Sequence, residues 1–402
     1  MALFLVALTV RICLIFVVGS YRQNEVTEVN NIARSLAISG GFADAYGPGS
    51  GPTAHAAPVY PFLLSSVFRV LGTGRAGEIG QEIFSSAIAS ITCALLPALA
   101  VAFGFPARVG WCAGFWAALF PINFYPETKG AFEGALVALS LVLICLYFAC
   151  VWTRGRLSAL EAVVGGMLAG IGTLVSPTVG AVAFLMLVIG GWVLRDKLRA
   201  YTRYAAAFAA VAIVSLIPWT LRNERALGSP IVARSNLGLE LMLSNNDRAE
   251  ADYFKNFANG VISQYHPFLN PVVRAAEIRE GEVAFQRARM KEAEAWIATH
   301  PRRFAELTAA RIAWFWFPSM ARSVQTVYLR LEVLLGFTGY VLLLLSRNRC
   351  LWLIAALWLG YPLIYYFVQS YSRYRYPVEW SFLFLGSYAI WRLYIRWAGT
   401  NA

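Results

Sequence analysis

The chain has 402 residues, of which 58% are hydrophobic and only 14% are charged. Since soluble proteins average roughly a quarter charged residues, this composition excludes a soluble globular protein and indicates a polytopic membrane protein. A net charge of +12 is also typical of nucleic-acid-binding proteins, but the placement of the basic residues, described below, argues against that function.

Ten apolar runs have the ~17–25 residues that a helix needs to cross a bilayer core. They lie near residues 2–20, 81–104, 108–125, 131–152, 158–177, 179–195, 203–221, 325–346, 351–369 and 377–396. A shorter apolar helix at 59–71 is expected to pack as a half-buried element. The sequence therefore predicts an all-α polytopic membrane protein with a bundle of about ten transmembrane helices.

Lysine and arginine are enriched in every second connection, which predicts the orientation of the spans. The basic connections contain Arg108; Arg154 and Arg156; Arg195, Lys197, Arg199 and Arg203; Arg347 and Arg349; and Arg396. Placing them in the cytoplasm puts both termini there and leaves 21–80, 126–130, 222–324 and 370–377 outside. We therefore expect a transmembrane core at 1–221, an extracytoplasmic subdomain at 222–324 and C-terminal transmembrane helices at 325–402.

The first outer loop, 21–80, opens with an amphipathic pattern. Val26, Val29, Ile32, Ala33, Leu36 and Ala37 recur at helical spacing, whereas Asn24, Glu28, Asn31 and Ser35 fall on the opposite side. Gly40 and Gly41 are expected to end this helix. A short amphipathic helix after a span is typical of the membrane interface, so we predict that it lies there.

Three acids are candidates for catalysis. Glu25 and Glu28 lie on or before the amphipathic helix, and Glu133 lies just inside an apolar run at the outer end of a span. A charge there costs a few kcal/mol unless it is paired or faces a cavity. Two carboxylates at one membrane level suit a general base and its orienting partner, and the residues leave Glu25 and Glu28 as rivals for the base. A solvated helix face is the alternative interpretation.

The last outer turn, R-Y-R-Y-P-V-E-W, predicts an anion site. The planar guanidinium groups of Arg373 and Arg375 suit phosphate oxygens, and Lys129 and Arg222 at neighbouring span ends could join them. Anchoring to lipid headgroups is the alternative for each of these residues.

Proline and glycine residues stiffen and turn the loop between the amphipathic helix and the helix at 59–71. We expect His55 and Tyr60 from this region, together with Tyr376 from the last outer turn, to line a substrate pocket. The three histidines and six cysteines have no metal-ligand spacing, and no Asp-x-Asp pair occurs in a suitable place, so the sequence predicts no metal site and no cofactor.

Several segments in order resemble the GT-C membrane glycosyltransferases, in the glycosyltransferase family 39 and protein O-mannosyltransferase-like group. They are E-V-N-N-I-A-R-S-L-A, A-P-V-Y-P-F-L-L, F-E-G-A-L-V-A-L, L-V-S-P-T, I-P-W-T-L-R-N, R-S-N-L-G-L-E-L-M-L-S-N-N and R-Y-R-Y-P. In this resemblance Glu28 matches the acid of the first outer loop and Glu133 the acid that opens the fourth span. A-P-V-Y-P departs from the more frequent P-P-x-Y-P.

The resemblance implies a polyprenyl-phosphate-linked sugar as donor and a hydroxyl group of a lipid, glycan or protein as acceptor. The expected function is inverting transfer on the extracytoplasmic face of an inner (plasma) membrane, with Glu28 as base, Glu133 as its partner and the arginines on the phosphate. A transporter or lipid flippase is the main alternative, although it predicts inverted repeats and broken helices near mid-membrane. An inactive assembly partner is a third interpretation.

Overall fold

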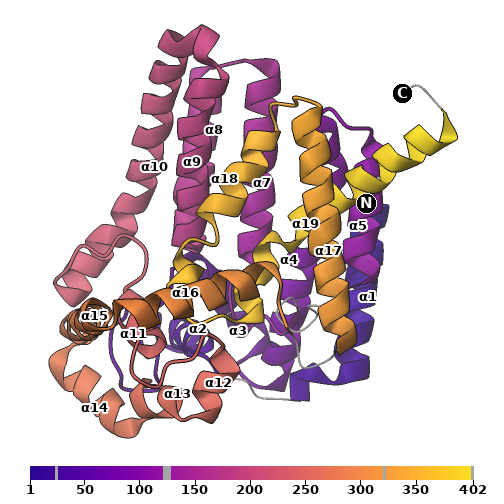
Figure 1. Cartoon of the computed structure of the whole chain (residues 1–402). Helices are drawn as coiled ribbons and strands as arrows, with labels where there is room; N and C mark the ends of the chain where they lie inside the picture. Colours follow the sequence, from indigo (N-terminus) through magenta and orange to yellow (C-terminus); the bar gives the residue numbers. More distant parts are fainter. Residues whose placement is uncertain (23–25, 121–127, 320–322, 400–402) are drawn as a thin grey trace.

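The computed structural model describes residues 1–22, 26–120, 128–319 and 323–399, and the described part is helical throughout. A bundle of helices makes up most of the molecule in Figure 1, where most of them run roughly parallel and the C-terminal helix crosses them obliquely. They are α1 (Ala2–Val18), α4 (Arg75–Ala102), α5 (Ala107–Leu119), α7 (Gly134–Arg154), α8 (Ala159–Val175), α9 (Pro177–Val193), α10 (Leu198–Leu227), α17 (Ser323–Leu345), α18 (Leu351–Gly360) and α19 (Ser372–Ala398).

Four of these helices are long and apolar enough to cross a membrane: those containing Arg75–Ala102, Gly134–Arg154, Arg195–Leu227 and Val324–Leu345. Shorter apolar helices add α1, α8, α9 and α18, together with α3 (Val59–Leu71). The prediction of a multi-pass, all-α membrane protein is confirmed in this form, while the count of about ten crossings stays a prediction.

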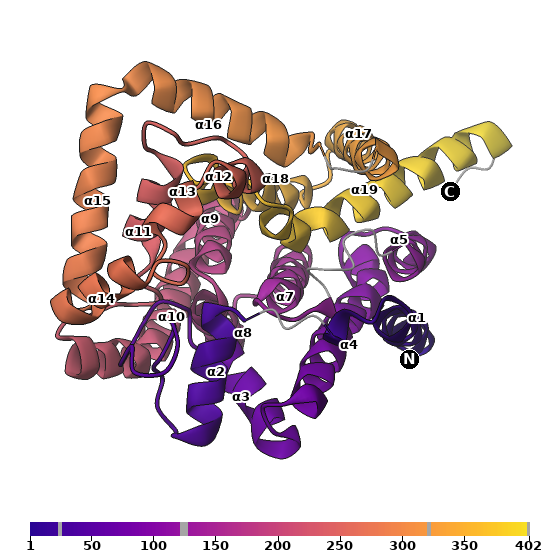
Figure 2. The same cartoon turned by 90° about the horizontal axis from the view of Figure 1, so that it is seen from below.

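The remaining helices gather at one end of the bundle (Figure 1). They are α2 (Glu28–Ile38), α3, α11 (Leu237–Ser244), α12 (Tyr253–Ala258), α13 (Val261–Tyr265), α14 (Pro271–Glu280), α15 (Glu282–Thr299) and α16 (Pro301–Trp316). Seen from that end, α15 and α16 border α11, α12 and α13 on two sides (Figure 2).

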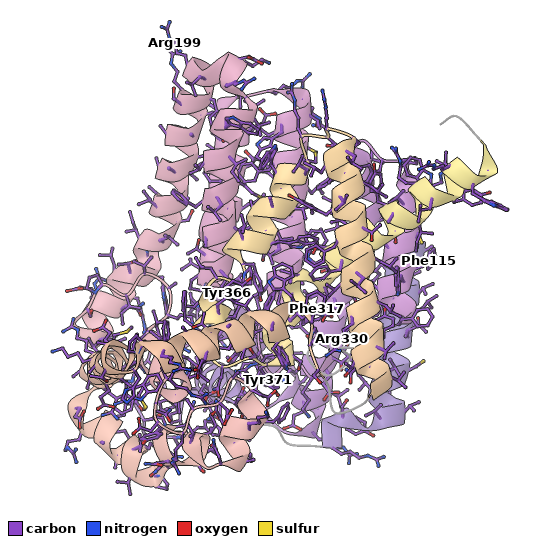
Figure 3. The ribbon with its side chains drawn as sticks, viewed as in Figure 1. Phe115, Arg199, Phe317, Arg330, Tyr366 and Tyr371 are labelled. Carbon is purple, nitrogen blue, oxygen red and sulfur yellow. The ribbon has the colours of Figure 1, made fainter. Side chains whose placement is uncertain are left out.

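The segments predicted to lie outside meet at this same end. Ser235 donates its backbone N–H to the Ala54 carbonyl at 2.9 Å, and Tyr253 donates to the Ser370 carbonyl at 3.0 Å. Arg199, in a connection predicted to be cytoplasmic, lies at the opposite end from Tyr371 (Figure 3). The arrangement therefore groups the polar loops as the charge pattern predicts, and which side of the membrane they occupy stays a prediction.

Two predicted helices differ from those in the structure. The apolar run 351–369 is helical only to Gly360, because Pro362 lacks an N–H and its ring blocks a continuing helix, and the 3-10 turn η3 (Ile364–Tyr366) follows. The charged stretch 272–297, which the sequence also predicts to be helical, forms two helices, α14 and α15, since Gly281 adopts a φ of 83° between them. The first change matters for function, because the chain after Gly360 lines the cavity described below.

The hydrophobic core packs helices from the first third of the chain, α4 and α5, together with the C-terminal helix α19. Phe103 and Phe105, at the end of α4 and just after it, pack on Phe384 of α19 with ring centroids 5.3 and 5.8 Å apart. Gly110 of α5 lies so close to the Leu96 carbonyl of α4 that an added Cβ would be 2.3 Å from the oxygen. These contacts hold α19, which carries the predicted arginines, against the end of α4, and they hold α4 against α5.

Candidate active site

The N-terminus of α2 is joined to the segment before α7, and this brings two of the predicted acids to one place. Thr27 caps α2 by accepting from the Asn30 N–H at 3.2 Å, and its hydroxyl donates to the Ala131 carbonyl at 3.0 Å. Glu28 is the first residue of α2, and Glu133 precedes the first residue of α7. A single side chain therefore links the two segments that carry Glu28 and Glu133.

A cavity of about 610 Å³ opens beside these acids, a size typical of small-molecule sites. Its floor is apolar and comes from α7, α9, α18 and the chain that follows α18, including Val137, Ala181, Gly360 and Leu363. Its charged and titratable lining side chains include Glu28, His55, Lys129, Glu133, Arg234, Glu240, His266 and Arg373. Of the predicted site residues, the structure places Glu28, Glu133, Arg373, Lys129 and His55 in the lining of this one cavity.

Most charges in the cavity are paired. Arg234 Nη1 lies 3.2 Å from Glu133 Oε1, and His266 Nε2 lies 3.5 Å from Glu28 Oε1. Lys129 Nζ lies 3.4 Å from Glu82 and donates to the Ser20 carbonyl at 2.8 Å. Such pairing lowers the cost of holding these groups in a largely apolar cavity.

Arg373 differs from these cations, because no carboxylate lies within ion-pair distance of it in the described ranges. Its guanidinium carbon lies 3.6 Å from the Phe132 ring centroid, and Nη2 donates to the Tyr374 hydroxyl at 3.1 Å. Its buried Nε has no hydrogen-bond partner among the residues that the structure describes. A guanidinium held by aromatic rings and lining a cavity can accept an incoming anion.

Several predicted site residues lie elsewhere. Arg375 is buried and ion-paired with Glu332 and Glu379, since residues two apart on α19 point about 200° away from each other. Arg222 donates to the carbonyls of Thr53 and Phe42 at 2.7 and 2.5 Å. Tyr60 lies behind the lining and donates to the Gly130 carbonyl at 2.6 Å, and Tyr376 lines a separate small void beside Glu379. These residues hold the site in shape without lining it. Glu25 lies outside the described residues.

The wall formed by residues 361–371 is held by another buried arginine. Arg311 of α16 donates to Asn245 Oδ1 and to the Phe367 carbonyl, each at 3.1 Å, and also to the Ser244 carbonyl at the end of α11. Its positive charge therefore lies at the C-terminal end of α11, where a helix dipole favours it. This contact fixes α11, which carries Glu240, against the turn that carries Tyr365 and Phe367.

Comparison with known proteins rests on the fold. No protein-family model matches the chain, and no relative was found among the curated proteins. The archaeal oligosaccharyltransferase AglB from Archaeoglobus fulgidus, in complex with an inhibitory peptide and a dolichol-phosphate, matches 100% of this chain with a TM-score of 0.57 and 12% identity. The same enzyme with zinc and sulfate matches 99% of it with a TM-score of 0.57 and 14% identity. The chain has the GT-C fold.

The match covers part of the larger enzyme. The chain spans 52% of the oligosaccharyltransferase in the first comparison and 50% in the second. ArnT from Cupriavidus metallidurans, solved with undecaprenyl phosphate, is 16% identical over 97% of this chain and 77% of its own, with a TM-score of 0.45. At 12% and 14% identity, the matches to the oligosaccharyltransferase show the fold alone.

Four other residues line this cavity that the sequence does not single out as site residues. They come from the long segment after α10 and are Arg234, Asn236, Glu240 and His266. Arg234 Nε donates to Asn236 Oδ1 at 2.7 Å while its Nη1 pairs with Glu133. The motif R-S-N-L-G-L-E-L at 234–241 contains three of the four, so their polar spacing before an apolar helix was a usable signal. His266 had none, because its place depends on how the segment folds back over α2.

The carboxylate of Glu282, at the start of α15, joins two walls of the cavity. It accepts from the Thr53 hydroxyl, from the Ala54 N–H at 2.8 Å and from the Ser235 hydroxyl at 2.6 Å. The neighbours of these residues in the chain, His55 and Arg234, line the cavity. Glu282 therefore sets the spacing between the first outer loop and the segment after α10.

Glu277, one helix earlier, makes folding stability depend on pH. Burial, and then the nearby charge of Glu282, raises the pKa of the Glu277 carboxyl from 4.5 to about 8 against the opposing effect of Arg274. Between these values the folded protein holds a proton that the unfolded chain has lost, so stability falls as pH rises from 4.5 to 8. We expect Glu277→Gln to abolish this fall, with a gain on the order of a few kcal/mol above pH 8.

The measurement is the melting temperature of the purified protein in detergent across this pH range. Glu280→Gln is the matched control, because Glu280 lies on the same helix with 39% of its side chain exposed. A Glu277→Gln variant whose melting temperature still falls as steeply as that of the parent would contradict the assignment.

Proposed function

We propose that this chain is an inverting membrane glycosyltransferase that moves a sugar from a polyprenyl-phosphate donor to a hydroxyl acceptor. The observation that carries the proposal is that one cavity is lined both by the carboxylate of Glu28 and by Arg373, for which the described residues provide no carboxylate partner. The GT-C fold supports it, because the matched oligosaccharyltransferase was solved with a dolichol-phosphate and an inhibitory peptide.

In the proposed reaction, the acceptor oxygen bonds to the anomeric carbon as the bond from that carbon to the phosphate oxygen breaks. Glu28 takes the proton of the acceptor hydroxyl, which is the role of a general base. The lipid phosphate leaves as an anion and needs no proton, and Arg373 stabilises its charge. Attack opposite the phosphate inverts the anomeric centre. Glu133 orients the site through its ion pair with Arg234, and Lys129 adds positive charge at the cavity edge.

The proposal includes the placement of the enzyme in the membrane. We place it in the inner (plasma) membrane with about ten crossings, both termini in the cytoplasm and the cavity on the extracytoplasmic face. Residues 1–221 and 325–402 form the membrane core and residues 222–324 the extracytoplasmic subdomain. The apolar floor of the cavity, which includes Val137, Ala181 and Leu363, suits the hydrocarbon part of the donor.

The test is to incubate the purified protein with radiolabelled polyprenyl-phosphate sugars and membrane extract. We expect the label to move to an acceptor, and we expect EDTA to leave the rate unchanged, because arginine and lysine neutralise the phosphate without a metal. Movement of the donor across vesicles without transfer would favour a flippase instead. Donor binding with neither reaction would favour an inactive assembly partner.

A further inference from the structure

His266 and the proposed base face each other inside the cavity. The Nε2 atom of His266 lies 3.5 Å from Oε1 of Glu28, and only 14% and 13% of the two side chains are exposed. In this largely dry setting a nitrogen-bound proton beside a carboxylate acts more strongly than in water. The pair joins α2 to the turn after α13, which are 238 residues apart in the chain (266 minus 28).

The other ring nitrogen of His266 decides which atom carries the proton. Its Nδ1 accepts a hydrogen bond from the Phe268 N–H at 3.1 Å. Because an imidazole nitrogen that accepts carries no proton, the neutral ring has its proton on Nε2, which is the atom nearest to Glu28. The backbone of the turn therefore selects the tautomer that donates toward the carboxylate.

The turn that carries His266 is held firmly. The His266 carbonyl accepts from the N–H groups of Leu269 and Asn270 at 3.1 and 2.9 Å. Arg274 donates to the carbonyls of Pro267 and Phe268 at 3.0 and 2.8 Å. The Tyr46 ring packs edge-on against the His266 ring, with centroids 6.0 Å apart. The backbone of the turn is thus fixed by hydrogen bonds and the ring by Tyr46, so the imidazole is positioned before substrate arrives.

The pair lies among other titratable and charged groups. Tyr46 lies near Glu28, Glu240, Glu277 and Glu282, and His55 lies near Arg234, His266 and Arg373. Burial, with added effects of Arg234, His266 and Arg373, lowers the pKa of His55 well below its usual value, so His55 stays neutral. Its Nδ1 is engaged by the Tyr46 hydroxyl at 3.0 Å. Of the two cavity histidines, His266 is thus the one that contacts Glu28.

We propose that His266 is a positioning residue for Glu28. Its Nε2 proton holds Oε1 of the carboxylate in place, which leaves Oε2 to take the proton of the acceptor hydroxyl. The inference rests on the proposed function, since it describes how the same base is oriented.

Two amide substitutions separate this role from a structural one. In His266→Gln the side-chain amide nitrogen reaches about as far as Nε2 and can donate to Glu28, but the turn loses its Nδ1 acceptor. In His266→Asn the amide oxygen replaces Nδ1 and keeps the Phe268 contact, but nothing reaches Glu28. The experiment measures kcat/KM for sugar transfer from about pH 5 to pH 9, with melting temperatures as a check on folding, and His300→Gln as the control at an exposed histidine.

We expect His266→Asn to lower kcat/KM about tenfold near neutral pH, while His266→Gln restores most of the loss. A histidine that only supports the turn would give the reverse order, with the asparagine variant the more active, and that result would overturn the inference. Equal activity in all variants would also overturn it. Absence of transfer by the parent protein would instead refute the proposed function.

Discussion

Glu28→Gln is expected to lower the rate of sugar transfer by about 10²–10⁴-fold, because that is what a positioned general base typically contributes. The amide cannot take the proton of the acceptor hydroxyl, yet it has nearly the same volume and still fits beside His266. Expression, membrane insertion and melting temperature should therefore stay close to those of the parent. The measurement is single-turnover transfer from a radiolabelled donor at saturating acceptor.

The matched control for this substitution is Glu294→Gln on α15, an exposed acid in the segment after α10 that does not line the cavity. It should leave transfer unchanged. If Glu28→Gln retains transfer within a few-fold of the parent, Glu28 is not the base. Glu133→Gln in the same assay then becomes the informative variant, since Glu133 lines the same cavity.

The second large effect separates two arginines that lie two residues apart. Arg373→Gln should weaken donor binding by about 10–100-fold, because a charge-assisted hydrogen bond contributes about 1.5–3 kcal/mol. Acceptor KM should change little. The measurement is the donor KM, or direct binding of the polyprenyl phosphate, and Arg373→Lys should recover part of the loss because it keeps the charge without the planar fork.

Arg375→Gln should instead damage the fold. Arg375 is 1% exposed and lies among the carboxylates of Glu332 and Glu379, so its removal leaves buried negative charge uncompensated, at a cost of about 3–5 kcal/mol. The melting temperature in detergent should fall sharply. Weaker donor binding in a well-folded Arg375→Gln variant, together with unchanged binding in Arg373→Gln, would reverse the roles of the two residues.

The difference between these arginines shows where sequence analysis stops. The motif R-Y-R-Y-P predicts one phosphate site for both arginines, because both precede a predicted span. In the structure α19 begins at Ser372, so Arg373 and Arg375 both lie within the helix. Side chains two residues apart on an α-helix point to nearly opposite sides. The start of that helix cannot be seen in the apolar pattern, since the hydrophobic run begins several residues later.

The helix that begins at Glu28 is easier to predict. The amphipathic pattern after residue 25 predicts a helix that ends near Gly40, and α2 ends at Ile38 with Gly40 in the left-handed region at φ 75°. Val26 falls outside the helix and is 40% exposed, because Thr27 caps α2 and the chain enters it only at Glu28. Capping and helix-ending signals depend on only a few neighbouring residues, and so they can be recognised in the sequence without knowledge of the fold.

The amino-acid sequence by itself determined the membrane class, the helical architecture, the grouping of polar loops and the choice of Glu28, Glu133 and Arg373 as candidates. These follow from composition, hydrophobic period and charge placement, which are local properties of the chain. Only the tertiary structure decided that Arg234 pairs with Glu133 and His266 with Glu28, and that Arg375 and Arg222 support the fold. Arg375 pairs with Glu379 only one helical turn away, but its direction depends on where α19 begins. The contacts of Arg234, His266 and Arg222 join residues from about 100 to more than 200 positions apart, and their geometry depends on packing that no local pattern encodes.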